Sequence, residues 1–377
     1  MAKNITKLKH RFPLRQIRQI PRFFRNFWPV LTLLTITLFL IYLNYEPKTY
    51  LIGWDNLNPE FDTWMNFKRT LFSVWQEYRG LGLLGGQAHA ADLPRILLIL
   101  LLQTFKIDNS LIRYITTFLP LILGPLGVYF LFDLHLFREK LDAKTTQFAS
   151  FLGALFYLLN LNTLQTFFVP FETFTWFYGA LPWLLFFTIS YISKPSTKKL
   201  FTLFVISLIA SPAFYVETIF LVFFVSIIPF IIEFFYQKRK ILTSIKIISG
   251  SIFSLVVPHL YWLLPVIFFV ISGGGHVAET AKINNISSPQ TYFRNLQFSN
   301  LPDLALMKGY LFNYLDMGAG YKYDYLLSVW RNHLSTPLIS LLGFLIFIVT
   351  MTGLYYSVKK RFTWTASFMS MLFLCLF

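Results

Sequence analysis

Charged side chains are scarce in this chain. Only 13% of its 377 residues are Asp, Glu, Lys or Arg, whereas 55% are hydrophobic and 19% are aromatic. A soluble domain is usually closer to one quarter charged. The composition therefore excludes an ordinary soluble domain and predicts a polytopic membrane protein.

Cysteine is almost absent, and the single Cys375 lies in an apolar run. One cysteine excludes an internal disulfide and a cysteine-based metal site. The His, Asp and Glu residues show no convincing metal-ligand spacing. The glycine-rich segment 80–86 lacks the Gly-Lys-Ser/Thr end of a phosphate-binding P-loop. We therefore expect no cofactor, and nothing in the sequence supports a divalent metal.

Acidic residues are the rarer charge, with 17 acids against 33 Lys and Arg residues and a formal net charge of +16. In a soluble chain such an excess would suggest a nucleic-acid partner. Here the basic residues cluster in short segments between apolar runs, so membrane orientation explains them and no nucleic acid is expected.

A transmembrane helix needs about 20 apolar residues. The apolar runs predict an all-α bundle of about nine transmembrane helices, at residues 28–43, 112–134, 146–163, 173–193, 198–212, 214–236, 245–272, 338–358 and 363–377. The basic segment 1–27 contains no acid, so the positive-inside rule places the N-terminus in the cytoplasm of a multi-pass plasma-membrane protein.

The apolar run 93–105 decides the predicted topology. It is about 13 residues long, which favours an interfacial or re-entrant helix. If it does not span, the basic loops near residues 138–144, 194–199, 238–240 and 359–361 all face the cytoplasm. The expected organisation is then a bundle over 28–272 with a first external loop at 44–111, a second external segment at 273–337, and further transmembrane helices over 338–377. Because the chain ends inside an apolar run, we expect it to be the N-terminal part of a longer protein.

In this topology, 13 of the 17 acids lie in external segments or at outer helix ends. Asp55, in Gly53-Trp54-Asp55-Asn56, opens the first external loop, and a charge held near a bilayer is a candidate for function. Asn56, Glu60 and Asp62 follow as candidate substrate-binding residues. From Asn58 onward, aromatic residues at helical spacing predict a helix lying in the membrane interface, for which simple anchoring is the structural alternative.

His89 and Arg95 follow the glycine-rich segment and could contact a phosphate at the membrane surface, with lipid-headgroup contact as the alternative. Asp92 is better placed to cap the helix that starts with Pro94. Glu172 and Glu217 each follow a proline that interrupts an apolar run, an arrangement that membranes tolerate where a cavity is lined. Each is a candidate site residue, unless it simply reaches the interface or pairs locally.

The second external segment is rich in tyrosine, and aromatic faces with interspersed polar groups suit sugar rings. Arg331 is a candidate phosphate ligand, because a guanidinium binds phosphate in bidentate fashion.

A first span, an external loop that opens with a carboxylate, and a dense helical bundle resemble the GT-C superfamily of integral-membrane glycosyltransferases. The stretches Gly53-Trp-Asp-Asn-Leu-Asn-Pro-Glu60 and Gly85-Gly-Gln-Ala-His-Ala-Ala-Asp-Leu-Pro-Arg95 look most like bacterial arabinofuranosyltransferase-type members. The resemblance covers roughly residues 25–377 in layout, and its motifs are short. It departs from the acidic pair typical of the family, because Asn56 and Leu57 follow Asp55.

The resemblance implies a polyprenyl-phosphate sugar donor, a glycan or lipid acceptor, and Asp55 as the catalytic base. One base opposite the leaving group would invert the sugar, with Glu172 or Glu217 orienting its hydroxyls. Three alternatives stay open: a lipid-linked polysaccharide ligase or polymerase that depends on basic residues, a transporter with mid-membrane charges and paired repeats, and a non-catalytic assembly or sensor protein.

Overall fold

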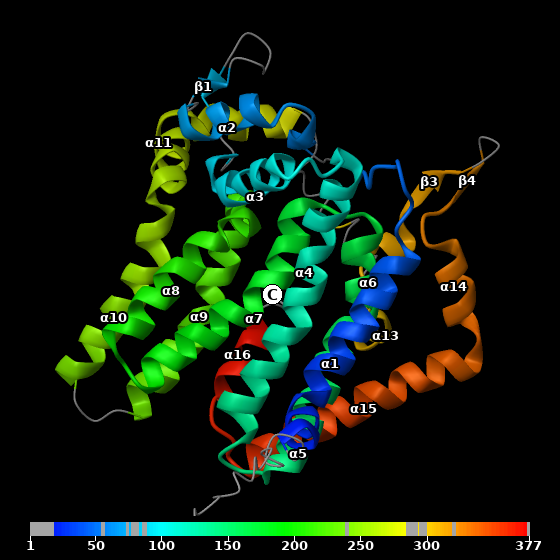
Figure 1. Cartoon of the computed structure of the whole chain (residues 1–377), viewed down its shortest axis with the longest axis vertical. Coiled ribbons are helices and arrows are strands. Elements are labelled where there is room, and N and C mark those ends of the chain that lie inside the picture. The colour runs from blue at the N-terminus through cyan, green and yellow to red at the C-terminus, as the bar shows by residue number, and fades with distance from the viewer. Residues whose placement is uncertain are drawn as a thin grey trace, which may run out of the picture.

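The computed structural model describes residues 19–53, 57–72, 75–76, 83–84, 89–237, 241–283, 293, 300–318 and 322–374. Helices dominate this part of the chain (Figure 1). Its strands form two short antiparallel pairs, β1 (Trp75–Gln76) with β2 (Leu83–Leu84) and β3 (Leu315–Met317) with β4 (Tyr323–Tyr325). The prediction of a mostly helical protein is confirmed, with these two hairpins as additions.

Helices of the first half of the chain begin with α1 (Gln19–Leu43), which leads into the first predicted external loop. That loop contains the 3-10 turn η1 (Pro59–Phe61), α2 (Thr63–Phe72), the 3-10 turn η2 (His89–Asp92) and α3 (Leu93–Thr104). The bundle continues with α4 (Asn109–Leu131), the π-helical turn η3 (Phe132–Phe137), α5 (Ala143–Leu159), α6 (Leu161–Phe168) and α7 (Glu172–Ser193).

The second half contains α8 (Thr197–Ile209), the 3-10 turn η4 (Ser211–Phe214), α9 (Glu217–Gln237), α10 (Ile241–Val256), the 3-10 turn η5 (Val257–His259) and α11 (Leu260–Ile283). It ends with α13 (Leu301–Ala305), the 3-10 turn η6 (Tyr310–Asn313), α14 (Ser328–Ser335), α15 (Pro337–Lys359) and α16 (Thr365–Leu374).

Five described helical segments are long and apolar enough to cross a membrane: Asn109–Phe137, Glu172–Ser193, Glu217–Tyr236, Ile241–Gly273 and Pro337–Lys359. The pair α5 and α6, bent by 43°, passes the same test as a sixth segment if counted together. Each of the nine predicted spans falls on a helix, but α8 and α16 are short, as is the apolar part of α1. Five or six described helices could therefore cross a membrane, which fits a membrane protein, and the count of nine stays a prediction.

The centre of the bundle is the crossing of α4 with α7, where glycines replace larger side chains. A Cβ added to Gly179 would lie 2.8 Å from Cα of Pro120, and one added to Gly124 would lie 2.6 Å from the ring of Tyr178. Small residues allow two membrane helices to approach closely, because lipid offers no hydrophobic force to join them. The Tyr157 hydroxyl also donates a 2.8 Å hydrogen bond to the Tyr178 carbonyl, joining α5 to α7.

The predicted loop helices α2 and α3 lie across one end of this bundle, transverse to α4 (Figure 1). Phe61, Trp64 and Phe72 on or beside α2 are 62%, 58% and 81% exposed. The apolar run 93–105 forms α3, which packs on α2, α4 and η4 instead of running alongside the bundle helices. This arrangement agrees with the prediction that this run does not span.

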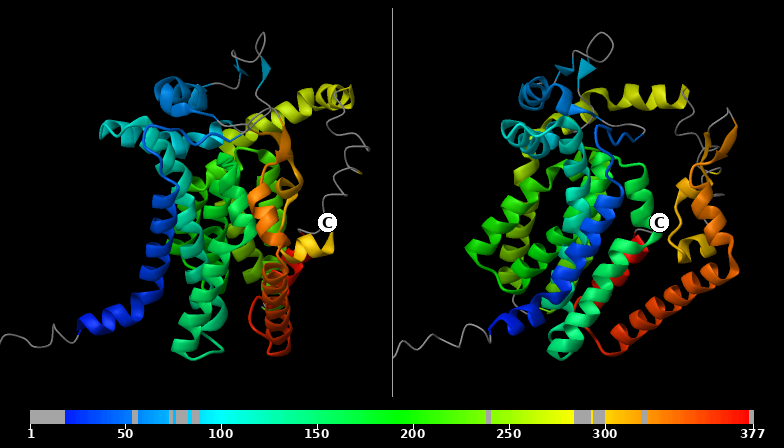
Figure 2. Two further views of the ribbon diagram at one scale, coloured as in Figure 1. Left: turned by 90° about the vertical axis from the view of Figure 1, so that its right-hand side faces the viewer. Right: turned by 45° about the vertical axis from the view of Figure 1, so that its right-hand side comes forward.

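Helix α15 stands apart from the bundle (Figure 2). None of its most apolar 18-residue window is buried. A helix that is apolar all round and unburied is expected to face lipid or another chain. Between α15 and the helices α4, α5, α7 and α16 lies an apolar cavity of about 770 Å³.

Candidate functional site

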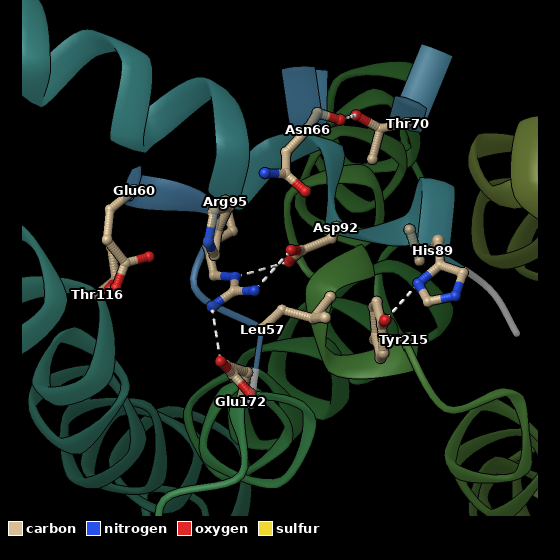
Figure 3. A network of polar contacts seen from close by, with 12 residues as sticks. Leu57, Glu60, Asn66, Thr70, His89, Asp92, Arg95, Thr116, Glu172 and Tyr215 are labelled. Carbon is tan, nitrogen blue, oxygen red and sulfur yellow. Dashed lines mark hydrogen bonds and ion pairs between the residues drawn. The ribbon is translucent and has the colours of Figure 1, made fainter. Parts of the chain in front are cut away.

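A buried cluster of ion pairs lies where the loop between α1 and α4, predicted to be external, meets the bundle (Figure 3). Its first member is Arg95, in the first turn of α3, whose side chain is 2% exposed. The guanidinium donates two hydrogen bonds to Asp92, of 2.7 Å from Nε and 2.6 Å from Nη2. Such a bidentate pair is the strong form of a charged hydrogen bond, and it fixes η2 to α3.

Asp92 was expected to cap α3, and this prediction is wrong in its detail. Asp92 occupies the capping position, but its side chain accepts no hydrogen bond from the backbone of α3. The carboxylate binds Arg95 instead, because a buried guanidinium without a counter-charge would cost far more than an uncapped helix end.

Arg113 is the second cation of the cluster, and its side chain is 1% exposed. Its Nη1 lies 2.9 Å from Oε1 of Glu172, and Nη1 of Arg95 lies 3.3 Å from the same oxygen. Glu172 therefore joins α3 and α4 to the first turn of α7. This carboxylate was predicted as a site residue, and the structure places it between two arginines.

Arg113 also holds the loop after α1 on both sides of the segment 54–56. Its Nε donates a 2.8 Å hydrogen bond to the Leu51 carbonyl, and its Nη1 donates a 2.9 Å hydrogen bond to the Leu57 carbonyl. Asp55 and Asn56, the first two predicted site residues, lie outside the described residues. Their described flanks are fixed to the same guanidinium that binds Glu172.

Glu60 completes the cluster as a third carboxylate. It is 2% exposed, its Oε1 lies 3.6 Å from Nη1 of Arg113, and this oxygen has no hydrogen-bond partner among the described residues. Its backbone carbonyl is held by the side chain of Gln103, which donates a 2.9 Å hydrogen bond. Three carboxylates therefore face two guanidiniums, so the cluster has a formal charge of −1.

The pKa directions follow from burial and from this imbalance. Burial raises the pKa of the Glu60 carboxyl, and the opposing effect of Arg113 is smaller. Burial likewise raises the pKa of Asp92 against the attraction of Arg95. For Arg95, burial acts to lower the pKa, but Asp92 and Glu172 outweigh it and the pKa is raised. Glu60 is the member best able to hold a proton, because Asp92 accepts two short bonds from a cation.

A second contact lies on the other side of η2. Nδ1 of His89 is hydrogen-bonded to the Tyr215 hydroxyl, and the two rings meet edge to face with centroids 4.9 Å apart. The hydroxyl of Ser211 in η4 donates a 2.7 Å hydrogen bond to the Ala91 carbonyl. The interruption between α8 and α9 is thus the place where η2 docks.

Glu217 begins α9 two residues after Tyr215. It is partly exposed, and no hydrogen bond or ion pair joins its carboxylate to another described residue. Of the two predicted carboxylates at interrupted helices, Glu172 is bound by cations and Glu217 is open to a ligand.

Asp62 and Arg331 have local structural roles. Oδ1 of Asp62 accepts a 2.9 Å hydrogen bond from the Met65 amide and so caps α2. The guanidinium of Arg331 binds Asn313 and the Phe312 carbonyl and lies 3.8 Å from the ring centre of Tyr325. Arg331 and Arg95 were predicted to bind phosphate, but both guanidiniums are already engaged within the protein.

Arg113 is the site residue that sequence reasoning missed, because it lies inside a predicted span. The available signal was a charged residue near the outer end of an apolar run, which is itself a mark of function in membranes. Among the described residues, no group of three or more His, Cys, Asp or Glu side chains could hold a metal ion.

Comparison of the chain with protein-family models, with curated proteins and with solved structures gives no match. The class of protein rests on the chain itself: a mostly helical membrane protein with an ion-paired cluster under its first loop.

Proposed function

We propose that this protein is a membrane glycosyltransferase of GT-C type. It transfers a sugar from a polyprenyl-phosphate donor to a glycan or lipid acceptor at the outer face of the plasma membrane. The observation that carries the proposal is the attachment of Leu51 and Leu57, on either side of the Asp55 segment, to Arg113 in the buried cluster.

A rigid frame at this point is what a catalytic loop requires. Reacting groups must be held within about 0.5 Å of their productive geometry, which calls for neighbours that are themselves locked by hydrogen bonds. Arg113 is locked by Glu172, and Glu172 is tied through Arg95 to Asp92. The three elements α3, α4 and α7 thus brace the loop that carries the proposed base.

In the proposed reaction, the Asp55 carboxylate takes the proton of the acceptor hydroxyl while the acceptor oxygen bonds to C1 of the sugar. The bond from C1 to the phosphate oxygen breaks on the opposite face, so the configuration at C1 inverts. Polyprenyl phosphate leaves with the bonding electrons. Glu217 is the open carboxylate suited to a sugar hydroxyl, and His89 is the remaining predicted contact for the phosphate.

The donor's lipid tail needs an apolar space within the bilayer. The cavity of about 770 Å³ beside α15 offers one, lined by residues such as Leu152, Leu181 and Leu345. Binding sites for small molecules commonly occupy 300–1,000 Å³.

Asp55→Asn tests the proposal directly. The purified protein is incubated with a panel of short-chain polyprenyl-phosphate sugars, and released polyprenyl phosphate is measured. Losing a general base should lower the transfer rate by about 10²- to 10⁴-fold. Asp108→Asn is the matched control. Asp108 caps α4 through Ser110, and Asn caps equally well, so this variant should keep its rate. A fully active Asp55→Asn enzyme would exclude Asp55 as the base.

A polysaccharide ligase or polymerase is the nearest alternative, and it would depend on basic residues at the outer face. The described arginines Arg95 and Arg113 are engaged by carboxylates and carbonyls, which favours the carboxylate-based reaction. Loss of activity in His89→Ala together with full activity in Asp55→Asn would reverse this preference.

A further inference from the structure

A second cavity, of about 810 Å³, lies at the end of the bundle opposite the ion cluster. Its wall includes residues from η3, the end of α7, the start of α8, the end of α9 and the connection between α15 and α16. Helix α7 joins the two sites. Glu172 is its first residue, and Lys194 directly follows its last. Its 22 residues separate the two sites by about 30 Å.

Three cations line this cavity: Lys194, Lys199 and Arg361. The Lys199 ammonium donates one hydrogen bond, of 2.8 Å, to the Ser190 carbonyl. Lys194 and Arg361 are exposed, and no hydrogen bond or ion pair joins either side chain to another described residue. The like charges of these cations repel one another, and a bound anion would reduce that repulsion.

The two carboxylates in the wall form no ion pair with these cations, and each is hydrogen-bonded to the start of α16 or to the residues before it. Glu233 accepts hydrogen bonds from the amides of Trp364 and Ser367, at 3.0 and 3.1 Å. Glu139 accepts a 3.1 Å hydrogen bond from the Thr363 hydroxyl. The orphan amides of the α16 terminus are thereby satisfied, and the acids are held against the helix.

The connection that carries Arg361 has an unusual backbone. Arg361 and Trp364 have φ of 51° and 67°, in the left-handed region that side-chain-bearing residues rarely adopt. Such conformations are strained, and they gather at ligand-binding sites where the surroundings enforce them. Wall residues from η3 add a π-helical turn, another irregularity that is frequent at functional sites.

We propose that this basic cavity binds a phosphate group, presented either by an anionic lipid headgroup or by a soluble phosphorylated compound. Lysine and arginine side chains between membrane helices are the groups that recognise lipid phosphates. The cavity has room for the phosphate together with the alcohol that it esterifies. This site is separate from the proposed transfer reaction and does not depend on it.

The test compares two charge-matched double variants of the whole chain. Lys194→Gln with Arg361→Gln removes the two unpaired cavity cations. Lys198→Gln with Lys360→Gln removes the same charge from neighbouring exposed positions that do not line the cavity. Thermal unfolding without ligand first establishes that both variants fold as the original protein does.

Lipid binding is measured by native mass spectrometry of protein released from vesicles of equal parts phosphatidylglycerol and phosphatidylcholine. Binding of a free anion is measured by thermal unfolding in inorganic phosphate against chloride of equal ionic strength. Each charged hydrogen bond contributes roughly tenfold in affinity, so the cavity variant should bind about 100-fold more weakly. The control variant should lose less than about fivefold, because its two charges do not line the cavity and act on the bound phosphate only through screening solvent.

If the unsubstituted protein and the control variant retain phosphatidylglycerol and the cavity variant does not, the site is supported and its ligand is a lipid headgroup. If no lipid is retained, and inorganic phosphate raises the unfolding temperature saturably in all but the cavity variant, the site is supported and its ligand is a soluble phosphate compound. Equal losses in both double variants would show attraction to the surface charge alone and would overturn the proposal. Absence of binding in the unsubstituted protein would overturn it as well.

Discussion

Replacing Arg113 with methionine should lower the free energy of unfolding far more than removing the charge of its partner Glu172. Arg113→Met leaves the three carboxylates facing Arg95 alone, two of them buried, and it frees the carbonyls of Leu51 and Leu57. Breaking a buried ion pair from one side costs about 3–5 kcal/mol of unfolding free energy. Glu172→Gln instead leaves two carboxylates with two guanidiniums, and its amide oxygen can still accept from Arg113. We expect that variant to lose about 1 kcal/mol, the value of one ordinary hydrogen bond.

The free energy of unfolding is measured by titrating the protein in mixed micelles with dodecyl sulfate and following helicity by circular dichroism. Arg138→Met is the control, because Arg138 is 63% exposed in its pair with Asp133, and such a pair contributes at most about 1 kcal/mol. The double variant Arg113→Met with Glu172→Gln should be more stable than Arg113→Met alone, since it removes one unpaired charge. Equal losses for Arg113→Met and Glu172→Gln would refute the charge count of −1.

Two further predictions concern protonation and packing. Because the folded-state pKa of Glu60 is raised, its contribution to stability is present at low pH and is lost as pH rises from the usual carboxyl range through the raised pKa. Glu60→Gln should therefore increase the unfolding free energy at neutral pH, by an amount on the order of 1 kcal/mol. The same variant should have little effect below about pH 4, where the Glu60 carboxyl is protonated. An increase that is equal at both pH values would contradict this reasoning. Gly179→Ala should lower the unfolding free energy by about 1–3 kcal/mol, because its Cβ would lie 2.8 Å from the Pro120 backbone. A Cβ at Gly353 would meet nothing within 4 Å, so Gly353→Ala should raise the unfolding free energy by about 0.5–1 kcal/mol in the same titration. Equal effects of the two alanines would exclude the close approach of α4 and α7.

The residues of the first loop show how far sequence reasoning reached. The aromatic spacing after Asn58 predicted a transverse helix, and α2 forms there. The short run 93–105 was predicted not to span, and α3 lies across the bundle end. The helices themselves were predictable because length and periodicity are local properties that a sequence displays directly, whereas their position relative to a membrane stays a prediction. The catalytic assignment of Asp55 stays a prediction, since that residue lies outside the described part of the chain.

The partners of the site residues were not predictable in the same way. Arg95 and Arg331 had the chemistry of phosphate ligands, yet their guanidiniums are engaged by Asp92 and by Asn313. Arg113 was overlooked inside an apolar run. Each of these outcomes depends on which helices meet, and a single sequence does not state its long-range contacts.

Composition and the spacing of apolar residues determined by themselves that the protein is helical and lies in a membrane. They also predict, by the positive-inside rule, that its acids gather toward one face and its basic loops toward the other. Only the tertiary structure decided which charges meet. A buried guanidinium is stable only beside a carboxylate, so Arg95 and Arg113 both bind Glu172. Among the described residues, Glu217 has no such partner, and the charges of Lys194 and Arg361 stay unpaired beside the second cavity.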